Sequence, residues 1–301
     1  YHIEKSYKVL FYSISGENVD FEFDKDTLTE LLEDFKFIYF WEYAHRLWVR
    51  ILGFIFLIPF IIFIIRKQIN FYLIKRLFVV VLFTALTASA GWIMVQSGLV
   101  DRPWVNAYKL TLHFILAVLS ISAMVKTIAD VYGYKNRNTA HNSRFIFIII
   151  AITFIQMVFA GLMSGMKAGL FYPSWPDMNG HFIPDVLLNG INYNWTNLTN
   201  YDKFVFAPAL VQFVHRILAY ILLLLTAYMF FKNRSIYHRT AKFWLDASFG
   251  MVLLQILLGI LTLLNIKGGI PLLYGVLHQL VGILFFISLL FLFFALRKKL
   301  I

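Results

Sequence analysis

Seven long, mainly apolar segments run through this sequence, and each is long enough to cross a membrane as a helix. They lie at about 45–65, 77–96, 108–128, 145–165, 209–231, 243–264 and 272–296. A helix needs roughly 20 apolar residues to span ~30 Å of hydrocarbon. In lipid, only helices and closed barrels satisfy all of their backbone hydrogen bonds. The sequence therefore predicts an all-α polytopic membrane protein.

The composition supports this fold class and excludes several kinds of chemistry. Only 14% of the 301 residues are charged, whereas soluble domains hold about 25%. The chain has no Cys, which excludes disulfides, thiolate metal ligands and thiol nucleophiles. A net charge of +11 could indicate a nucleic-acid partner, but most basic residues lie in short loops between the apolar segments. We therefore expect the lipid bilayer as the partner and no nucleic acid.

Basic residues also predict how the chain is oriented in the membrane. The loops at 66–76, 131–144 and 232–242 and the last residues hold most of the Lys and Arg, and the alternate loops hold few. Because basic loops face the cytoplasm, we expect a cytoplasmic C-terminus, and a bacterial cytoplasmic membrane rather than a mitochondrial inner membrane. Residues 1–44 are then an outer segment. A helix is expected in "TLTELLEDFKF", lying either in the membrane interface or in water as an ordinary solvated helix.

An internal repeat relates the two halves of the chain. "EYAHRLWVRILG" (42–53) resembles "QFVHRILAYILL" (212–223), "ALTASAGWIMVQSG" (85–98) resembles "ILLGILTLLNIKGG" (256–269), and "YKLTLHFILAVL" (108–119) resembles "LYGVLHQLVGIL" (273–284). Span 145–165 has no counterpart in the first half. Such a repeat predicts two pseudo-symmetric four-helix bundles, the first lacking its first helix. The expected domains are 45–130, an inner loop at 131–144, and 145–301, which includes an outer loop at 166–208.

Four histidines stand near the outer ends of matched spans. These residues are His45, His113, His215 and His278. A lone membrane histidine can simply hydrogen-bond a neighbouring helix, but intramembrane ionisable residues that recur in a repeat indicate function. Zinc would need a third protein ligand, and only Glu42 is nearby. Haem iron takes two axial ligands in trans, so the pattern predicts two bis-histidine haem sites inside the helical bundles.

Charged neighbours of these histidines suggest further roles. Arg46 and Arg216 follow their histidines and could pair with haem propionates, or could instead reach lipid head groups. Glu42 lies one helical turn before His45 and corresponds to Gln212, so only the first half has a carboxylate at this position. That carboxylate could accept protons during a reaction. The alternative is that it pairs with Arg46 or Arg50.

At these residues the chain resembles the haem A synthase family. The resemblance rests on "WEYAHRLWVRILG", "GWIMVQSGL", "GLMSGMKAGLFYPSWPDMNGHFIPD" (161–185), "VQFVHRILAY" and "LHQLVGILFF", and it covers nearly the whole chain from residue 30. It implies eight spans in two four-helix halves, of which this chain holds seven. It also implies conversion of the C8 methyl group of haem O to a formyl group by successive hydroxylations, for cytochrome oxidase biogenesis.

The resemblance also implies residue roles and partners. His215 and His278 would ligate a resident haem B. His45 and His113 would hold the haem O substrate, with Glu42 beside the reacting methyl group as the catalytic residue. A haem O synthase, an electron acceptor and a second copy of the chain are expected partners.

Two other functions compete with this interpretation. A di-haem electron carrier would have the same bis-histidine sites without chemistry on either haem. A transporter could also show repeated halves. Transporters, however, are expected to have polar groups near the membrane midplane, whereas these polar groups cluster at the outer end.

Overall fold

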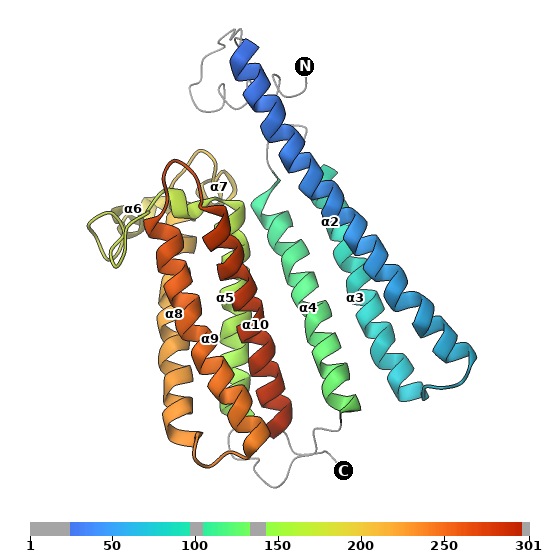
Figure 1. Cartoon of the computed structure of the whole chain (residues 1–301). Coiled ribbons are helices and arrows are strands. Elements are labelled where there is room, and N and C mark those ends of the chain that lie inside the picture. Colours follow the sequence, from blue (N-terminus) through green and yellow to red (C-terminus); the bar gives the residue numbers. More distant parts are fainter. Residues whose placement is uncertain (1–24, 97–104, 133–142, 297–301) are drawn as a thin grey trace. The chain divides into compact units, whose positions relative to one another are not determined.

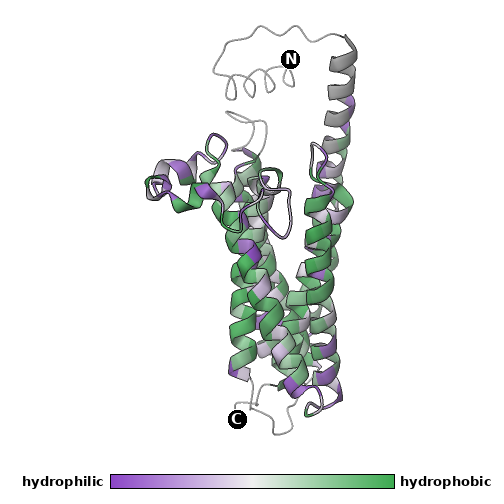
Figure 2. Cartoon of the chain, turned by 90° about the vertical axis from the view of Figure 1, so that its left-hand side faces the viewer, coloured by the Kyte–Doolittle hydropathy of each residue, from purple (hydrophilic) through white to green (hydrophobic). Residues whose placement is uncertain are grey.

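The computed structural model describes residues 25–96, 105–132 and 143–296, and it confirms all seven predicted spans. The long helices are α2 (Lys25–Ile65), α3 (Phe71–Gln96), α4 (Ala107–Val131), α5 (Ser143–Gly165), α8 (Phe206–Asn233), α9 (Arg239–Leu264) and α10 (Leu272–Leu296). Each contains a stretch long and apolar enough to cross a membrane. Apolar residues run along these helices and hydrophilic residues gather at their ends (Figure 2). The described residues contain no β-strand beyond one isolated bridge, so the chain is an all-α multi-pass membrane protein.

The first span begins earlier than its hydropathy alone suggests. The predicted interfacial helix and the span at 45–65 belong to one continuous 41-residue helix, α2, whose membrane-crossing part is Tyr39–Ile65. A boundary at residue 44 therefore falls inside a helix. The residues before 25, most of the inner loop at 131–144 and the basic C-terminal residues lie outside the described residues.

The chain divides into two compact units. One contains α2 and the two ends of α3. The other contains the middle of α3, from Val80 to Trp92, together with all residues from Asn106 onward. The two haem-binding halves predicted from the sequence, 45–130 and 145–301, do not coincide with these two compact units. The division into haem-binding halves therefore stays a prediction.

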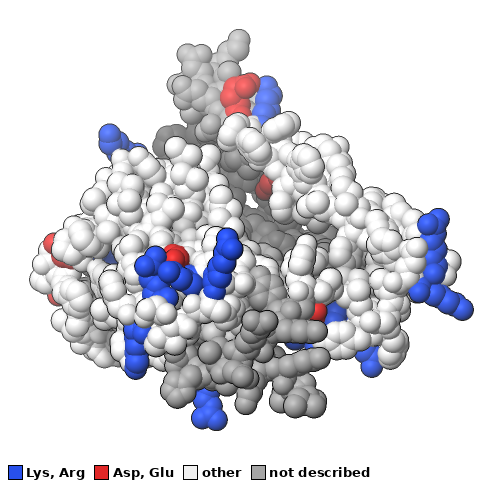
Figure 3. Space-filling view, turned by 60° about the horizontal axis from the view of Figure 1, so that its bottom comes forward, with Lys and Arg blue, Asp and Glu red and all other residues white. Residues whose placement is uncertain are grey.

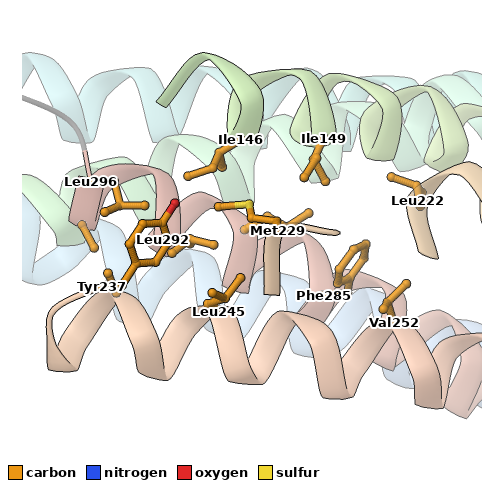
Figure 4. Close-up of a cluster of buried hydrophobic side chains, with 13 residues drawn as sticks. Ile146, Ile149, Leu222, Met229, Tyr237, Leu245, Val252, Phe285, Leu292 and Leu296 are labelled. Atoms are coloured by element: carbon orange, nitrogen blue, oxygen red, sulfur yellow. The ribbon is translucent and has the colours of Figure 1, made fainter. Parts of the chain in front are cut away.

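Four helices of the second unit, α5, α8, α9 and α10, pack around one apolar core (Figure 1). Its buried residues include Ile146, Met229, Leu245 and Leu292, which point toward one another in Figure 4. Because lipid tails are as apolar as these side chains, close van der Waals packing must hold the helices together. The predicted four-helix bundle in the second half is therefore present.

Small residues bring α4 and α5 into close contact. A Cβ added to Gly165 would lie 2.6 Å from the Cα of Ala107, and one added to Gly161 would lie 3.1 Å from the Cα of Thr111. Gly161 and Gly165 are four residues apart, as in the small-residue motifs at which membrane helices approach closely. This contact attaches α4 to the second bundle.

The connection from α5 to α8 is long and structured. It contains η2 (Ala168–Leu170), α6 (Asp185–Leu188), η3 (Gly190–Asn192) and α7 (Trp195–Thr199), which lie at the upper end of α5 and α8 in Figure 1. The turn at Asn179 and Gly180 uses positive φ angles of 57° and 91°. Glycine adopts such a backbone readily, and Asn tolerates it better than most residues.

Basic residues also lie at the opposite end of the second bundle, where α8 ends and α9 begins. Figure 3 shows Lys and Arg side chains projecting from the surface. One of the basic residues, Arg234, contacts Asp246 across 2.8 Å, and this carboxylate raises the pKa of the guanidinium. The distribution agrees with the charge pattern of the loops.

Candidate functional site

Two of the four predicted site histidines face each other inside the second bundle. His215 lies on α8 and His278 on α10, with ring centroids 6.3 Å apart and ring planes at 61°. Two imidazole nitrogens each about 2 Å from one metal ion stand about 4 Å apart, which places the ring centres roughly 6 Å apart. The spacing of this pair therefore fits two axial ligands on one iron.

A backbone carbonyl orients the imidazole of His278. Its Nδ1 lies 3.0 Å from the carbonyl oxygen of Gln255 on α9. A proton on Nδ1, donated to this carbonyl, leaves Nε2 unprotonated and able to bind a metal ion, as metal-ligating histidines commonly are arranged. Gly259, one turn later on α9, completes the contact, because a Cβ there would lie 2.9 Å from Cε1 of His278.

The environment of His113 on α4 repeats this arrangement. Its Nδ1 lies 2.8 Å from the carbonyl oxygen of Thr87 on α3, and a Cβ on Gly91 would lie 2.9 Å from its Cε1. His113 and His278 each stand six residues after the first residue of their helices. The structure thus makes these two histidines equivalent, as the repeat predicts.

The same comparison corrects the repeat alignment in one helix pair. Thr87 and Gly91 contact His113 as Gln255 and Gly259 contact His278, so Gly91 corresponds to Gly259. The sequence alignment of 85–98 with 256–269 instead paired Ala88 with Gly259 and is three residues out of register. Apolar residues in lipid-embedded helices carry little positional information, and the histidine contacts supply it.

Several buried polar atoms around the His215–His278 pair have no hydrogen-bond partner. They include Nδ1 of His215 and the side-chain oxygens of Gln156 and Gln255. Gln156 donates to the backbone oxygen of His215 at 2.9 Å. The amide nitrogen of Gln255 lies 3.3 Å from Nε2 of His278. Each unpaired buried group costs about 1–3 kcal/mol, so their concentration around this pair fits a site that binds a ligand better than a purely structural core.

Arg216 holds the outer loop rather than projecting freely toward lipid or ligand. Nη1 donates to the backbone oxygen of Asp177 at 2.6 Å, and Nη2 donates to those of Ser174 at 2.9 Å and Tyr172 at 3.1 Å. Gln212, which is fully buried, donates to the same Tyr172 oxygen at 2.8 Å. Gln212 and Arg216 thus fasten the loop from Tyr172 to Asp177 to α8, within one turn of His215. A role for Arg216 in pairing with propionates stays a prediction.

Sequence reasoning found Arg216 but not its loop partners, because no local pattern reveals which carbonyls a guanidinium meets. The loop is also ordered internally: the hydroxyl of Ser174 donates to the carboxylate of Asp177 at 2.6 Å, and the backbone nitrogen of Asn179 donates to the same hydroxyl oxygen at 2.6 Å. The Ser174 hydrogen bond, followed by one from the backbone of Gly180, lowers the pKa of Asp177.

Glu42, His45 and Arg46 lie on α2, in the first unit, and all three are exposed. Arg46 donates to the Glu42 carboxylate at 2.7 Å, so the ion pair that competed with a catalytic role for Glu42 is present. A pair this exposed adds little to stability. In the second half, the equivalent positions Gln212 and Arg216 bind the outer loop instead. The pairing of His45 with His113 stays a prediction.

No three His, Asp or Glu side chains among the described residues form a cluster able to hold a metal ion. The fold and site therefore define a multi-pass helical membrane protein with a half-buried pair of facing histidines inside a helical bundle.

Comparisons with known proteins agree with this class. A family described as "Cytochrome oxidase assembly protein" matches residues 14–290. The chain is 34% identical to a heme A synthase of Wolbachia pipientis wMel, covering 99% of this chain and 77% of the relative. It is 35% identical to a heme A synthase of Nitrosospira multiformis, covering 92% of this chain and 77% of the relative. No solved structure matches. The chain belongs to this family of cytochrome oxidase assembly proteins, which includes heme A synthases.

Proposed function

We propose that this protein makes haem A from haem O, by oxidising the C8 methyl group to a formyl group. Two successive hydroxylations, each taking its oxygen from water and releasing two electrons to an electron acceptor, give a geminal diol, which loses water to form the aldehyde. The observation that carries the proposal is the His215–His278 pair, with ring centroids 6.3 Å apart and His278 oriented by a backbone carbonyl. The curated relatives named heme A synthase support the choice of reaction.

His215 and His278 hold a resident haem B in this proposal. When bound, haem B supplies one-electron redox chemistry. The chain's own contribution is to orient the imidazole of His278 through the contact of its Nδ1 with the backbone carbonyl of Gln255, and to fasten the outer loop to α8 through Gln212 and Arg216. That loop limits the access of water to the outer end of the site, which strengthens electrostatic interactions inside it.

The first half holds the substrate. His113 has the same carbonyl and glycine contacts as His278, which supports a matching role as a haem O ligand, with His45 as the second ligand. Glu42 is the proton acceptor, because it places a titratable carboxylate next to the substrate half. Its counterpart in the second half, Gln212, cannot take up a proton. The proposal also places the protein in a bacterial cytoplasmic membrane with its C-terminus inside. Its expected partners are an electron acceptor, a haem O synthase and a second copy of the chain.

Pigment extraction tests the function. The full-length protein is expressed with a source of haem O, and the bound haems are extracted and separated. Wild type should yield haem A, while His278→Ala and His215→Ala should lose haem B and form no haem A. His181→Ala is the matched control, because His181 is exposed in the outer loop. If the folded wild-type protein contains bound haem but yields only haems B and O, the proposal is contradicted. That result would favour a di-haem electron carrier.

A further inference from the structure

The outer connection contains a long segment with no charged residue. Residues 186–201, "VLLNGINYNWTNLTNY", include no Lys, Arg, Asp or Glu. About a quarter of the residues in soluble proteins are charged, so an aqueous loop of this length would normally contain several. The segment includes most of α6, and all of η3 and α7.

Apolar side chains of this segment divide into two sets. Leu187 and Leu198 pack against Phe206 and Ala209 at the start of α8, which fastens the segment to the bundle. The second set, named here the exposed apolar set, consists of Leu188, Ile191 and Trp195. Their exposed fractions are 68%, 82% and 78%, so they contact little of the chain itself.

The polar side chains of the segment are used within it. The side-chain oxygen of Asn189 accepts from the backbone nitrogen of Ile191 at 3.1 Å, and that of Asn194 accepts from the backbone of Asn197 at 2.8 Å. Asn192 donates to the backbone oxygen of Val186 at 2.9 Å. These bonds satisfy backbone groups that would otherwise need water. Internal satisfaction of the backbone is what a segment in contact with lipid requires.

The position of the segment indicates what it contacts. It lies beside the outer end of α8 (Figure 1), and Phe206, five residues after its last residue, begins a membrane-crossing helix. Trp and Tyr are enriched at this level of membrane proteins. Surfaces that bind other proteins are enriched in Arg and Met, and this segment contains neither residue.

We propose that residues 186–201 lie in the outer lipid interface, with Leu188, Ile191 and Trp195 inserted among the lipids. The segment anchors the outer loop laterally, while Gln212 and Arg216 fasten it to α8. This inference concerns the membrane and does not depend on the haem chemistry.

Single spin labels test the depth directly, because the chain has no native Cys. Leu188→Cys and Ile191→Cys are labelled with a nitroxide in lipid nanodiscs, and accessibility is compared for oxygen, which partitions into lipid, and a water-soluble nickel chelate. Leu224→Cys, exposed in the middle of α8, is the lipid reference. Lys203→Cys, exposed and charged in the same connection, is the aqueous reference.

Labels at 188 and 191 should prefer oxygen by several-fold relative to the label at 203, with values between those at 203 and 224. Chelate access equal to that at 203 would overturn the proposal. Labels that are aqueous in pure lipid nanodiscs but become protected in native membranes would also overturn it, and would indicate a protein partner instead.

Discussion

Gly259 on α9 meets the imidazole of His278 on α10 so closely that a Cβ would lie 2.9 Å from Cε1. The ring is therefore held between a backbone carbonyl and a position that only glycine can occupy without displacement. Gly91 and His113 repeat the contact. Glycine at these two places determines where each imidazole can lie.

Gly259→Ala should displace His278 and reduce bound haem B at least several-fold. Gly250→Ala on the same helix is the matched control, because nothing lies within 4 Å of its added Cβ. Gly250→Ala should bind the normal amount of haem B. It should also be slightly more stable, since Ala is favoured over Gly in helices by about 0.5–1 kcal/mol. The haem content of each purified variant is measured by its pyridine haemochrome spectrum. Equal loading of both variants would contradict the assigned contact.

Gly165→Ala should weaken the contact between α4 and α5. The added Cβ would stand 2.6 Å from the Cα of Ala107, and backbone cannot give way as a flexible side chain can. Overpacking of this kind costs about 1–3 kcal/mol. Unfolding in increasing SDS measures the change, again with Gly250→Ala beside it. A Gly165→Ala protein as stable as the control would show that the two helices separate easily.

Arg216→Gln should release the loop from Tyr172 to Asp177. Hydrogen bonds to a charged group contribute about 1.5–3 kcal/mol each, and this guanidinium makes three to loop carbonyls. Opening of the loop should therefore increase at least tenfold, measured as hydrogen exchange of residues 171–182. Lys203→Gln, in the same connection, should leave exchange unchanged. Arg216→Lys should fall between the two, because an ammonium group lacks the planar fork of the guanidinium.

The loop should loosen in acid because of Asp177. Its pKa lies below the ordinary value of 3.8, so the carboxylate stabilises the folded loop at every pH above that value. This stabilisation is lost as the pH falls through the lowered pKa of the folded loop. Protection of the loop against hydrogen exchange, measured relative to the intrinsic exchange rate at each pH, should fall only below about pH 4, and Asp177→Asn should remove this dependence. Loosening of the loop at neutral pH would point to another group.

Glu42→Gln should lower haem A formation by about a hundredfold or more, the usual contribution of a general base, while both haems still bind. The substitution also removes the charge that pairs with Arg46, so Arg46→Gln separates the two effects. Haem A yield and haem O content are measured on the same samples. If Arg46→Gln is as inactive as Glu42→Gln, the ion pair rather than the proton acceptor is what matters.

The sequence by itself determined the spans of this protein. Span 272–296 matches α10 at both ends. The other six spans agree with the membrane-crossing helices within six residues at each end, the largest differences being the earlier starts at Tyr39 and Phe71. Hydrocarbon imposes this pattern on each segment separately, because every membrane-crossing helix must be apolar whatever its neighbours are. The equivalence of His113 and His278 could also be recognised from the sequence. Histidine is rare in membrane-crossing helices, so a histidine at a matching position in each half identifies the two residues as counterparts.

Only the tertiary structure decided which groups meet. It placed His215 opposite His278, set Gly91 rather than Ala88 as the counterpart of Gly259, and directed Arg216 to the loop carbonyls of Tyr172, Ser174 and Asp177. These relationships join residues far apart in the chain, and no local periodicity encodes them. They follow from how the helices pack and how the outer loop folds back, which are properties of the whole bundle rather than of any one segment.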